Sequence, residues 1–337
     1  MTFCALVDEL ASSHSRYQLG ALECAEAEVL NQSRLRHPHI VALHEVFLTD
    51  NFLVLVLDYA AGGDLQELAS RGHGLQEHTA RWLFQQVLFA LDYCHRMGVA
   101  SRDIKPENIL LVDDLKSPRP LVKLADFGLS TQCRAEGHTR PVGTPGYMAP
   151  EIVLASLCGR SYDAKKVDVW SAGVLLYTLL TGSAPFQRPA DAQLPREQRV
   201  KAVLQRILRL DYSLPNSVSA SCRDLLLSLL EPDASRRPSI QQVMQHPWCC
   251  EGVEAGAILH CNDVFTASSM ANPPSPQLLQ EVLSILAEAC MGPEPVVRDR
   301  LAKTRSVDTA ASSEGSDSTA DGAMASGSNS AASIACA

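Results

Sequence analysis

The hydrophobic and polar positions divide the chain into a short strand-rich part and a longer helical part. Apolar residues on one side of the segment from about 22 to 35 predict an amphipathic helix, which the His37-Pro38 pair ends. Two apolar stretches, 40–47 and 52–57, follow with a turn-forming Thr-Asp-Asn between them. Together these segments predict the remainder of a small sheet-containing lobe.

After Gly62-Gly63 the pattern becomes helical. Apolar residues recur at three- and four-residue spacing through 78–97, which predicts a helix. Two short strands, Ile109 to Val112 and Leu121 to Leu124, are joined by a turn and predict a hairpin. The segment Val167 to Leu180 is apolar nearly all round, which is typical of a helix buried inside a domain. Further helices are expected at 196–209, 219–230 and 239–245.

The character of the chain changes again from Glu251. A Pro-Pro-Ser-Pro run precedes a short amphipathic helix expected at 277–289. Beyond about Ser306 the chain is mostly Ser, Ala, Gly and Asp, and disorder is expected because little there can be buried. The predicted organisation is an atypical N-terminus, a partial small lobe, a large helical lobe, a tail and a disordered end, at 1–20, 21–60, 61–250, 251–305 and 306–337.

Composition narrows the class of protein. With 337 residues, of which 46% are hydrophobic and 20% charged, the chain can bury the core of one large domain or of two lobes. A net charge of -9 argues against a general nucleic-acid or membrane-surface role, because such binders usually carry a basic face. A cationic substrate suits this charge better.

Cysteine usage and the N-terminal residues indicate the compartment. Eleven cysteines occur without a C-x-x-C pair, so reduced cytosolic or nuclear thiols are expected. Cys249-Cys250 and His260-Cys261 are the nearest approach to a metal cluster, but adjacent side chains rarely chelate one ion together. The first residues lack a signal-peptide pattern and the apolar runs are too short to span a bilayer. We expect a cytoplasmic or nuclear monomer without membrane or nucleic-acid partners.

The stretch S-R-D-I-K-P-E-N, Ser101 to Asn108, carries residues suited to phosphoryl transfer. That reaction needs a positioned nucleophile, metal ligands for the phosphates and cations around the developing charge. Asp103 could accept or orient the proton of an attacking hydroxyl, and Lys105 could lie against the transferring phosphate. Asn108 could hold a magnesium ion through its amide oxygen. For each of these Asp and Asn residues an ordinary turn position is the alternative, which their joint spacing disfavours.

Three more motifs follow in order. The A-D-F-G motif offers Asp126 as a second metal ligand directly after a strand. G-T-P-G-Y-M-A-P-E begins at Gly143, and D-V-W-S-A-G begins at Asp168. The four motifs in this order resemble those of the protein kinase family. The resemblance covers about residues 20 to 250. It implies an α+β, two-lobed fold, with an incomplete small β lobe and a mainly helical large lobe, that binds ATP and Mg²⁺ in the cleft between the lobes.

The resemblance also implies roles for residues of the small lobe and the connection after it. Glu28 resembles the helix glutamate that orients the ATP-contacting lysine of relatives; the alternative is a solvated helix face. Leu57 resembles the residue at the back of the adenine pocket. Asp58, Tyr59 and Ala60 resemble the hinge whose backbone meets adenine.

In the large lobe the resemblance implies structural and regulatory roles. Asp168 would support the catalytic loop through its backbone, and Glu151 would pair with Arg237. Arg102 would meet a phosphate on the activation loop, added by an upstream kinase and removed by a phosphatase. The candidate phosphate acceptors, each of which could equally be an ordinary loop hydroxyl, are Thr139, Ser130 and Thr131.

Substrate handling follows from the same resemblance. Lys105 with G-T-P is similar to the serine/threonine-specific branch, in which Thr144 would bond Asp103 and Lys105. A-A-G-G-D-L, K-P-E-N and H-P-W are similar to the calmodulin-dependent-kinase-like group. There Asp64, beside the nucleotide, and Glu107 would bind arginines N-terminal to the target hydroxyl. Two further stretches, Q-R-I-L-R-L-D-Y-S-L-P and L-A-E-A, resemble the plant stress-activated kinases related to the sucrose-nonfermenting kinase.

The sequence departs from the family pattern in two places. Residues 1–20 contain one glycine and no lysine, so the Gly-rich loop and the phosphate-gripping strand lysine are lacking, and Lys105 is the first lysine in the sequence. Glu28 would therefore lack its partner. Ser101 stands where relatives have His, which should weaken assembly of the catalytic loop more than the chemistry.

Three hypotheses follow. The first is a Ser/Thr kinase of protein substrates whose sequence as given is N-terminally incomplete. The second is a truncated kinase-like protein that is catalytically weak or inactive and serves as a binding or regulatory module. The third, an unrelated phosphotransferase on the same fold, is disfavoured by G-T-P-G-Y and A-P-E, which belong to the handling of protein substrates. We expect a serine/threonine protein kinase, and the choice between the first and the second hypothesis stays open.

Overall fold

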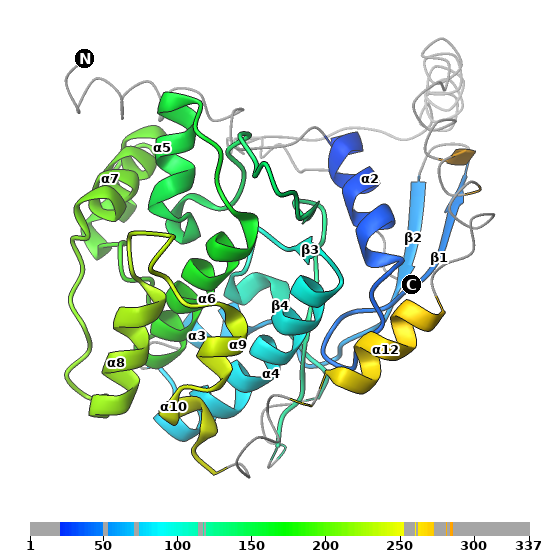
Figure 1. The fold of residues 1–337 in the computed structure, drawn as a ribbon. Helices are drawn as coiled ribbons and strands as arrows, with labels where there is room; N and C mark the ends of the chain where they lie inside the picture. The colour runs from blue at the N-terminus through cyan, green and yellow to red at the C-terminus, as the bar shows by residue number, and fades with distance from the viewer. Residues whose placement is uncertain are drawn as a thin grey trace, which may run out of the picture. The chain divides into compact units, whose positions relative to one another are not determined.

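The computed structural model shows a chain of helices and short strands (Figure 1), which confirms the α+β expectation. It describes residues 21–49, 53–70, 74–113, 117, 119–252, 260, 262–272, 281, 284 and 285. The chain divides into a larger unit, residues 1–43 and 58–275, and a smaller one, residues 44–57 and 276–337. The segments 1–20 and 306–337 lie outside the described residues, as does most of the helix predicted at 277–289.

Two long helices form the centre of the larger unit. Helix α4 (Glu77–Arg96) buries Leu83, Val87 and Leu88, which belong to the apolar stripe that the sequence predicted. Helix α6 (Ala164–Thr181) is buried on nearly every side, as its uniform apolar pattern indicated. The two helices pack against each other. Figure 1 shows both helices in the middle of the larger unit.

Shorter helices pack around these two. The predicted helices at 196–209, 219–230 and 239–245 are confirmed as α7 (Arg196–Arg209), α8 (Ala220–Leu229) and α9 (Ile240–Met244). Four further helices were not predicted: α3 (Leu65–Ser70), α5 (Pro150–Cys158), α10 (Pro247–Cys250) and α12 (Asp263–Ala271). These helices are short, and a pattern of four to nine residues carries little periodicity.

A second apolar cluster lies under α7. The rings of Trp170 and Phe186 stack at 5.8 Å, and Tyr212 meets Phe186 edge-on at 5.4 Å. Two 3-10 helices, η3 (Pro145–Tyr147) and η4 (Pro189–Gln193), lie beside α7. This cluster therefore fixes the segment after the G-T-P motif against α7.

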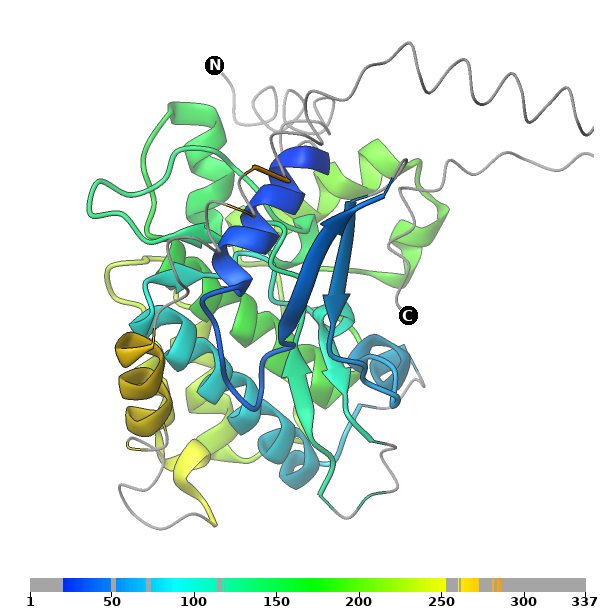
Figure 2. The same ribbon diagram turned by 90° about the vertical axis from the view of Figure 1, so that its right-hand side faces the viewer.

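The strands of the larger unit are short. The predicted hairpin is confirmed as β4 (Ile109–Leu111) and β5 (Val122–Leu124), with Ile109 opposite Leu124 (Figure 2). A second antiparallel pair joins β3 (Val99–Ala100) to β6 (Thr131–Gln132). Between β3 and β4 lies η2 (Pro106–Asn108). The chemistry-bearing stretch is thus held between two strand pairs.

The strand predicted at 40–47 was wrong at its N-terminal end. The smaller unit's sheet consists of β1 (Leu43–Leu48) and β2 (Leu53–Leu57). Ile40 is buried and forms a bridge with Leu124, and the Val41 amide donates to the Leu124 carbonyl at 3.0 Å. These two residues pair with β5 because the hairpin offers an unpaired edge that requires hydrogen-bond partners.

Helix α2 (Ala21–Gln32) belongs to the larger unit and ends earlier than predicted. Its last turn is tied down by buried amides: Asn31 Nδ2 donates to Ser130 Oγ at 2.9 Å, and Gln32 Nε2 donates to the Val41 carbonyl at 2.7 Å. Buried polar groups of this kind must be paired, so these bonds specify one position for the helix.

Helix α12 lies along α4 (Figure 2). Asn262, directly before α12, donates to Asp92 Oδ2 at 2.9 Å, and its Oδ1 lies 3.0 Å from His37 Nε2. The His37 ring stacks on Tyr93 at 5.0 Å, and the Tyr93 hydroxyl bonds Ser269 at 2.7 Å. Burial lowers the pKa of His37 to about 4, so the imidazole is neutral in this contact.

Arg237 joins three parts of the larger unit and is 1% exposed. Its guanidinium donates to both carboxylate oxygens of Glu151 at 2.7 and 3.1 Å and to the carbonyls of Lys166 and Glu231 at 2.6 and 3.0 Å. It also lies 5.2 Å from the centre of the Trp170 ring. The ion pair of Glu151 with Arg237 that the sequence predicted is therefore present, and almost every donor of the guanidinium is hydrogen-bonded.

We predict that Arg237→Lys lowers the free energy of unfolding by roughly 1–3 kcal/mol, because an ammonium cannot reproduce the forked geometry and leaves buried acceptors unpaired. Urea unfolding measures the change. The matched control is Arg236→Lys, whose side chain is 73% exposed, with an expected change within about 0.5 kcal/mol. Equal effects of the two substitutions would contradict the argument.

Candidate active site

The carboxylate of Asp103 is the centre of the candidate site and is 3% exposed. Its Oδ1 accepts from the Thr144 amide at 3.1 Å and from the Thr144 hydroxyl at 2.7 Å. Its Oδ2 accepts from Lys105 Nζ and, at 3.1 Å, from Asn108 Nδ2. Lys105 also donates to Thr144 Oγ1 at 3.1 Å. The residues predicted to be catalytic are therefore brought together in one network.

Asp168 fixes the backbone that leads to Asp103. Its fully buried carboxylate accepts from the Ser101 amide at 3.0 Å and from the Arg102 amide at 2.7 Å. His95 Nε2 lies 2.8 Å from the same carboxylate. Arg102 has a φ of 63°, a left-handed conformation that costs free energy for a residue with a Cβ atom. The Asp168 hydrogen bonds stabilise this turn.

Ser101 is fully buried, and its hydroxyl has no hydrogen-bond partner within the described part of the chain. An unpaired buried hydroxyl costs roughly 1–3 kcal/mol. The backbone of Ser101 nevertheless keeps its bond to Asp168. Ser101 therefore lowers stability through its unpaired hydroxyl but leaves the backbone of the loop in place.

Asp126 follows β5 and, with Asn108, supplies oxygen donors suited to a hard cation. It has a φ of 58°, and its Oδ1 accepts from the Gly128 amide at 3.1 Å. Asn108 uses its amide nitrogen for Asp103, at 2.9 Å to the carbonyl and 3.1 Å to Oδ2, which leaves its amide oxygen for another partner. One carboxylate and one amide oxygen fit Mg²⁺, which usually takes its other ligands from phosphates and water.

Glu28 is 9% exposed, so the alternative of a solvated helix face was wrong. Burial, followed by the negative charge of Asp126, raises the pKa of Glu28 to about 7. Among the described residues no lysine or arginine forms an ion pair with it. The helix thus holds a carboxyl beside Asp126 without a compensating cation in the described part of the structure.

The predicted activation-loop residues are placed as follows. Arg102 is buried; its Nε donates to the Leu129 carbonyl at 2.8 Å and its Nη1 to the Tyr162 hydroxyl at 3.3 Å. Tyr162 in turn donates to the Arg140 carbonyl at 2.7 Å. Thr139 is exposed, whereas Ser130 is buried and bonded to the Phe127 carbonyl and Asn31.

Two contacts of this segment were not predicted from the sequence. Tyr162 lies between Arg102 and Arg140, and Arg140 forms a bidentate ion pair with Glu23 of α2 at 3.0 and 3.1 Å. Neither residue belongs to the quoted motifs. No periodicity or spacing could have identified them, because each acts through a contact between segments far apart in sequence.

The residues expected around the adenine differ in the unit to which they belong and in their exposure. Leu57 ends β2 of the smaller unit. The side chain of Asp58 accepts from the Ala42 amide at 3.1 Å and pairs with Lys123 at 2.8 Å. Tyr59 is 79% exposed. Asp58 therefore fixes the start of the segment predicted to be the hinge, within the larger unit.

The residues expected to bind substrate arginines are accessible. Asp64 is partly exposed, and its Oδ1 accepts from the Glu67 amide at 2.9 Å at the start of α3. Ala60, which was expected in the hinge, is also partly exposed. Glu107 is exposed on η2, two residues after Lys105. Both carboxylates are thus at least partly accessible to solvent.

Comparison with known proteins identifies the family. The protein kinase domain model matches residues 11–249. Serine/threonine-protein kinase SRK2I of Arabidopsis thaliana is 38% identical over 284 residues, 82% of this chain and 73% of the relative. SRK2A of Physcomitrium patens is 38% identical over 272 residues, covering 79% and 73%. SAPK3 of Oryza sativa subsp. japonica is 39% identical over 272 residues, covering 79% and 77%.

The chain belongs to the protein kinase family. Its Ser/Thr kinase relatives make it a serine/threonine protein kinase by class, and the sequence-based resemblance is confirmed. Members of this family use ATP and Mg²⁺ and act on proteins. The described cysteines are free thiols, and no helix in the described ranges is both long and apolar enough to cross a membrane.

Glu28 generates a pH-dependent prediction. Its pKa is higher in the folded state, about 7, than in the unfolded chain, so the folded state holds a proton that the unfolded state releases. Protonation of Glu28 therefore contributes to the free energy of unfolding. The contribution is fully present below about pH 4.5 and is lost as the pH rises through about 7. Glu28→Gln should therefore stabilise the protein by roughly 1–3 kcal/mol at pH 8, and the gain should vanish near pH 4.5.

Chemical unfolding over this pH range, in buffer without divalent cations, tests the prediction. Glu26→Gln is the matched control because Glu26 is exposed on the same helix. The difference in free energy of unfolding between Glu26→Gln and the wild type should not change with pH in the way expected for Glu28→Gln. A Glu28→Gln variant that is less stable than wild type at pH 8 would show that an unseen cation compensates the carboxylate.

Proposed function

We propose that this chain transfers the γ-phosphate of ATP to serine or threonine hydroxyls of protein substrates. The observation that carries the proposal is the Asp103 network, in which a lysine, an asparagine and a threonine converge on one buried carboxylate. Phosphoryl transfer requires mainly positioning and electrostatic stabilisation, and these are the residues suited to it. In the reaction the oxygen of the hydroxyl bonds to the γ-phosphorus, and the bond from that phosphorus to the leaving ADP oxygen breaks.

Asp103 would orient the attacking hydroxyl and take its proton. In the structure it already accepts four hydrogen bonds from Thr144, Lys105 and Asn108, which is about the capacity of a carboxylate. One donor must therefore move when a hydroxyl binds. Lys105 is the suitable one, because its flexible ammonium can turn to the incoming phosphate while Thr144 and Asn108 hold the carboxylate in place.

Asn108 and Asp126 would hold Mg²⁺, which when bound neutralises charge on the phosphates. Both residues sit at strand boundaries, Asn108 before β4 and Asp126 after β5. The Ala125 amide donates to the Asn108 carbonyl at 2.8 Å. This backbone bond keeps the two donor residues at a fixed separation.

The preferred substrates carry arginine upstream of the target residue. Asp64 and Glu107 are accessible carboxylates, and the net charge of -9 favours a cationic partner. Thr139, exposed on the activation segment, is the acceptor for an upstream kinase, and a phosphatase would reverse the modification. The resemblance to plant stress-activated kinases supports a role in stress signalling in the cytoplasm or nucleus.

One observation favours a second candidate function. Glu28 is buried beside Asp126 without a cationic partner in the described residues, whereas an efficient kinase uses a lysine in this place to grip the phosphates. The second candidate is a kinase with weak or no transfer that serves chiefly as a binding or regulatory protein.

We predict that Asp126→Ala abolishes any phosphate transfer that the purified chain shows, because a metal ligand is lost. Transfer of labelled phosphate from ATP to a serine peptide with an upstream arginine is the readout. The control is Asp113→Ala, which removes an exposed carboxylate outside the proposed site. It should leave the rate unchanged.

Two results would overturn the primary proposal. Equal transfer by wild type and Asp126→Ala would assign the activity to a contaminating kinase. Absence of transfer by the wild type, together with no thermal shift on addition of Mg²⁺ and ATP, would support the binding or regulatory function.

A further inference from the structure

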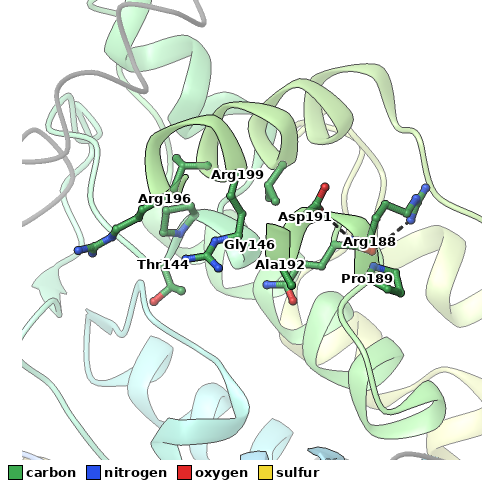
Figure 3. A pocket seen from close by; sticks show the side chains of 12 residues that line it. Thr144, Gly146, Arg188, Pro189, Asp191, Ala192, Arg196 and Arg199 are labelled. Carbon is green, nitrogen blue, oxygen red and sulfur yellow. Dashed lines mark hydrogen bonds between the residues drawn. The ribbon is translucent and has the colours of Figure 1, made fainter. Parts of the chain in front are cut away.

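Glu28 differs from the other buried carboxylates of the described ranges. Five acidic side chains are buried there: Glu28, Asp92, Asp103, Asp168 and Asp191. Asp191 lines the pocket shown in Figure 3, and its carboxylate accepts from Arg206 at 2.6 and 2.7 Å. Asp92, Asp103 and Asp168 likewise accept hydrogen bonds from side chains or amides. Glu28 accepts none from a described residue and forms no ion pair with one, so it is the buried carboxylate left to a ligand.

The face of α2 that carries Glu28 lies on the D-F-G turn. Cys24, Glu28 and Asn31 share this face, because residues three and four apart are neighbours on a helix surface. A Cβ atom on Gly128 would lie 3.4 Å from the Cβ atom of Cys24. Asn31 Nδ2 donates to Ser130 Oγ at 2.9 Å. Glu28 lies between these two contacts and therefore faces the turn.

Asp126 lies on the same side of the turn. The position of a Cβ atom on Gly128 is 3.2 Å from Asp126 Oδ1 as well as beside Cys24, so α2 and the Asp126 carboxylate meet at this glycine. The negative charge of Asp126 adds to the effect of burial in raising the pKa of Glu28 to about 7. The two carboxyl groups thus repel each other, and a cation between them would relieve the repulsion.

We propose that Glu28 and Asp126 together bind a divalent cation of the Mg²⁺ and Mn²⁺ class. The proposal rests on the cation site of the proposed function and adds Glu28 to the donors already assigned there, Asp126 and Asn108. The ion can bind without phosphate transfer, so the two proposals can fail separately. No lysine precedes Lys105 in the sequence, and a bound divalent ion would supply positive charge next to α2.

The chemistry of the donors favours a hard divalent cation. Carboxylate and amide oxygens suit Mg²⁺ and Mn²⁺, whereas thiolate ligands select softer ions. Burial, followed by the charges of Asp126, Glu23 and Glu28, raises the pKa of the Cys24 thiol, which disfavours its thiolate. Arg140, which contacts α2, is already bound to Glu23 at 3.0 and 3.1 Å.

Mn²⁺ binding to the purified full chain without nucleotide tests the proposal separately from catalysis. Free Mn²⁺ gives a sharp electron paramagnetic resonance signal that is lost on binding, so a titration measures the dissociation constant. Glu28→Gln and Asp126→Asn should each weaken binding by roughly 10-fold or more, because a carboxylate ligand is lost. Glu28→Asp, which keeps the charge on a shorter side chain, should retain part of the affinity.

Two control variants separate a ligand role from a general charge effect. Glu26→Gln makes the same charge change at an exposed position on α2 and should leave the affinity unchanged. Arg16 is the one lysine or arginine that precedes Glu28 in the sequence, and it lies outside the described residues. Arg16→Ala should also leave the affinity unchanged.

Thermal unfolding gives a second readout. Mn²⁺ should raise the midpoint of unfolding of the wild type, because it binds the folded state, and should raise that of Glu28→Gln less. Without divalent cations Glu28→Gln is expected to be the more stable of the two. Weak binding by this variant would then not come from loss of the fold.

Three outcomes would overturn the proposal. The first is that the wild type binds no Mn²⁺ without nucleotide. The second is that Glu28→Gln and Glu26→Gln bind Mn²⁺ alike. The third is that Arg16→Ala strengthens Mn²⁺ binding by the wild type but not by Glu28→Gln, which would make Arg16 the partner of Glu28.

The results also separate this proposal from the proposed function. If Mn²⁺ binds through Glu28 but no phosphate is transferred, the cation site is supported and the catalytic proposal fails. If phosphate is transferred while Glu28→Gln leaves Mn²⁺ binding unchanged, the catalytic proposal stands and the role of Glu28 as a ligand fails.

Discussion

The buried carboxylate of Asp168 is the interaction on which the candidate site depends. It lies on α6, the most deeply buried helix, and holds the amides of Ser101 and Arg102. Because Arg102 adopts a left-handed backbone, the loop would relax to another conformation without these bonds. With them, Asp103 is directed to Thr144, Lys105 and Asn108. The rigidity of a core helix is thereby transmitted through two hydrogen bonds to the residues proposed to act on substrate.

Charge in the site is unevenly distributed. On the side proposed for the target hydroxyl, Asp103 is surrounded by a lysine and three neutral donor groups, so its negative charge is well stabilised. On the side of α2, Glu28 and Asp126 repel each other, and burial adds to the cost of a charged Glu28. A divalent cation and a nucleotide would thus meet a fully hydrogen-bonded Asp103 on one side and the uncompensated carboxyl of Glu28 on the other. This contrast makes both proposed functions physically reasonable.

Much of the larger unit could be predicted from the sequence, because its long helices have distinct periodicity. The apolar stripe of α4 and the uniform apolar pattern of α6 each indicated the burial that the structure shows. The spacing of Asp103, Lys105 and Asn108 indicated a common site, and the structure places them in contact. The placement of Ile40 was not predictable, because a strand-like pattern does not state which edge it will join.

Contacts between segments far apart in the chain also could not be predicted from the sequence. The Tyr162 hydroxyl accepts a hydrogen bond from Arg102, and the backbone of Tyr162 pairs with that of His138. No local sequence pattern predicts either contact. The ion pairs of Arg188 with Asp211 and of Arg140 with Glu23 are likewise visible only in the structure. Local sequence thus predicts elements and motifs, whereas the partners of charged side chains depend on the assembled fold.

The position of α2 decides whether Glu28 stays buried, and the helix is held at both ends. At its start Glu23 pairs with Arg140, but both side chains are about half exposed, and such pairs contribute about 1 kcal/mol or less. Beyond its end, His37 stacks on Tyr93 and meets Asn262, which is itself bound to Asp92. This second anchor is buried and hydrogen-bonded, so it is the firmer of the two. The helix therefore cannot relieve the repulsion at Glu28 by moving as a whole, and protonation of Glu28, or a cation brought by a ligand, remains as the means of relieving it.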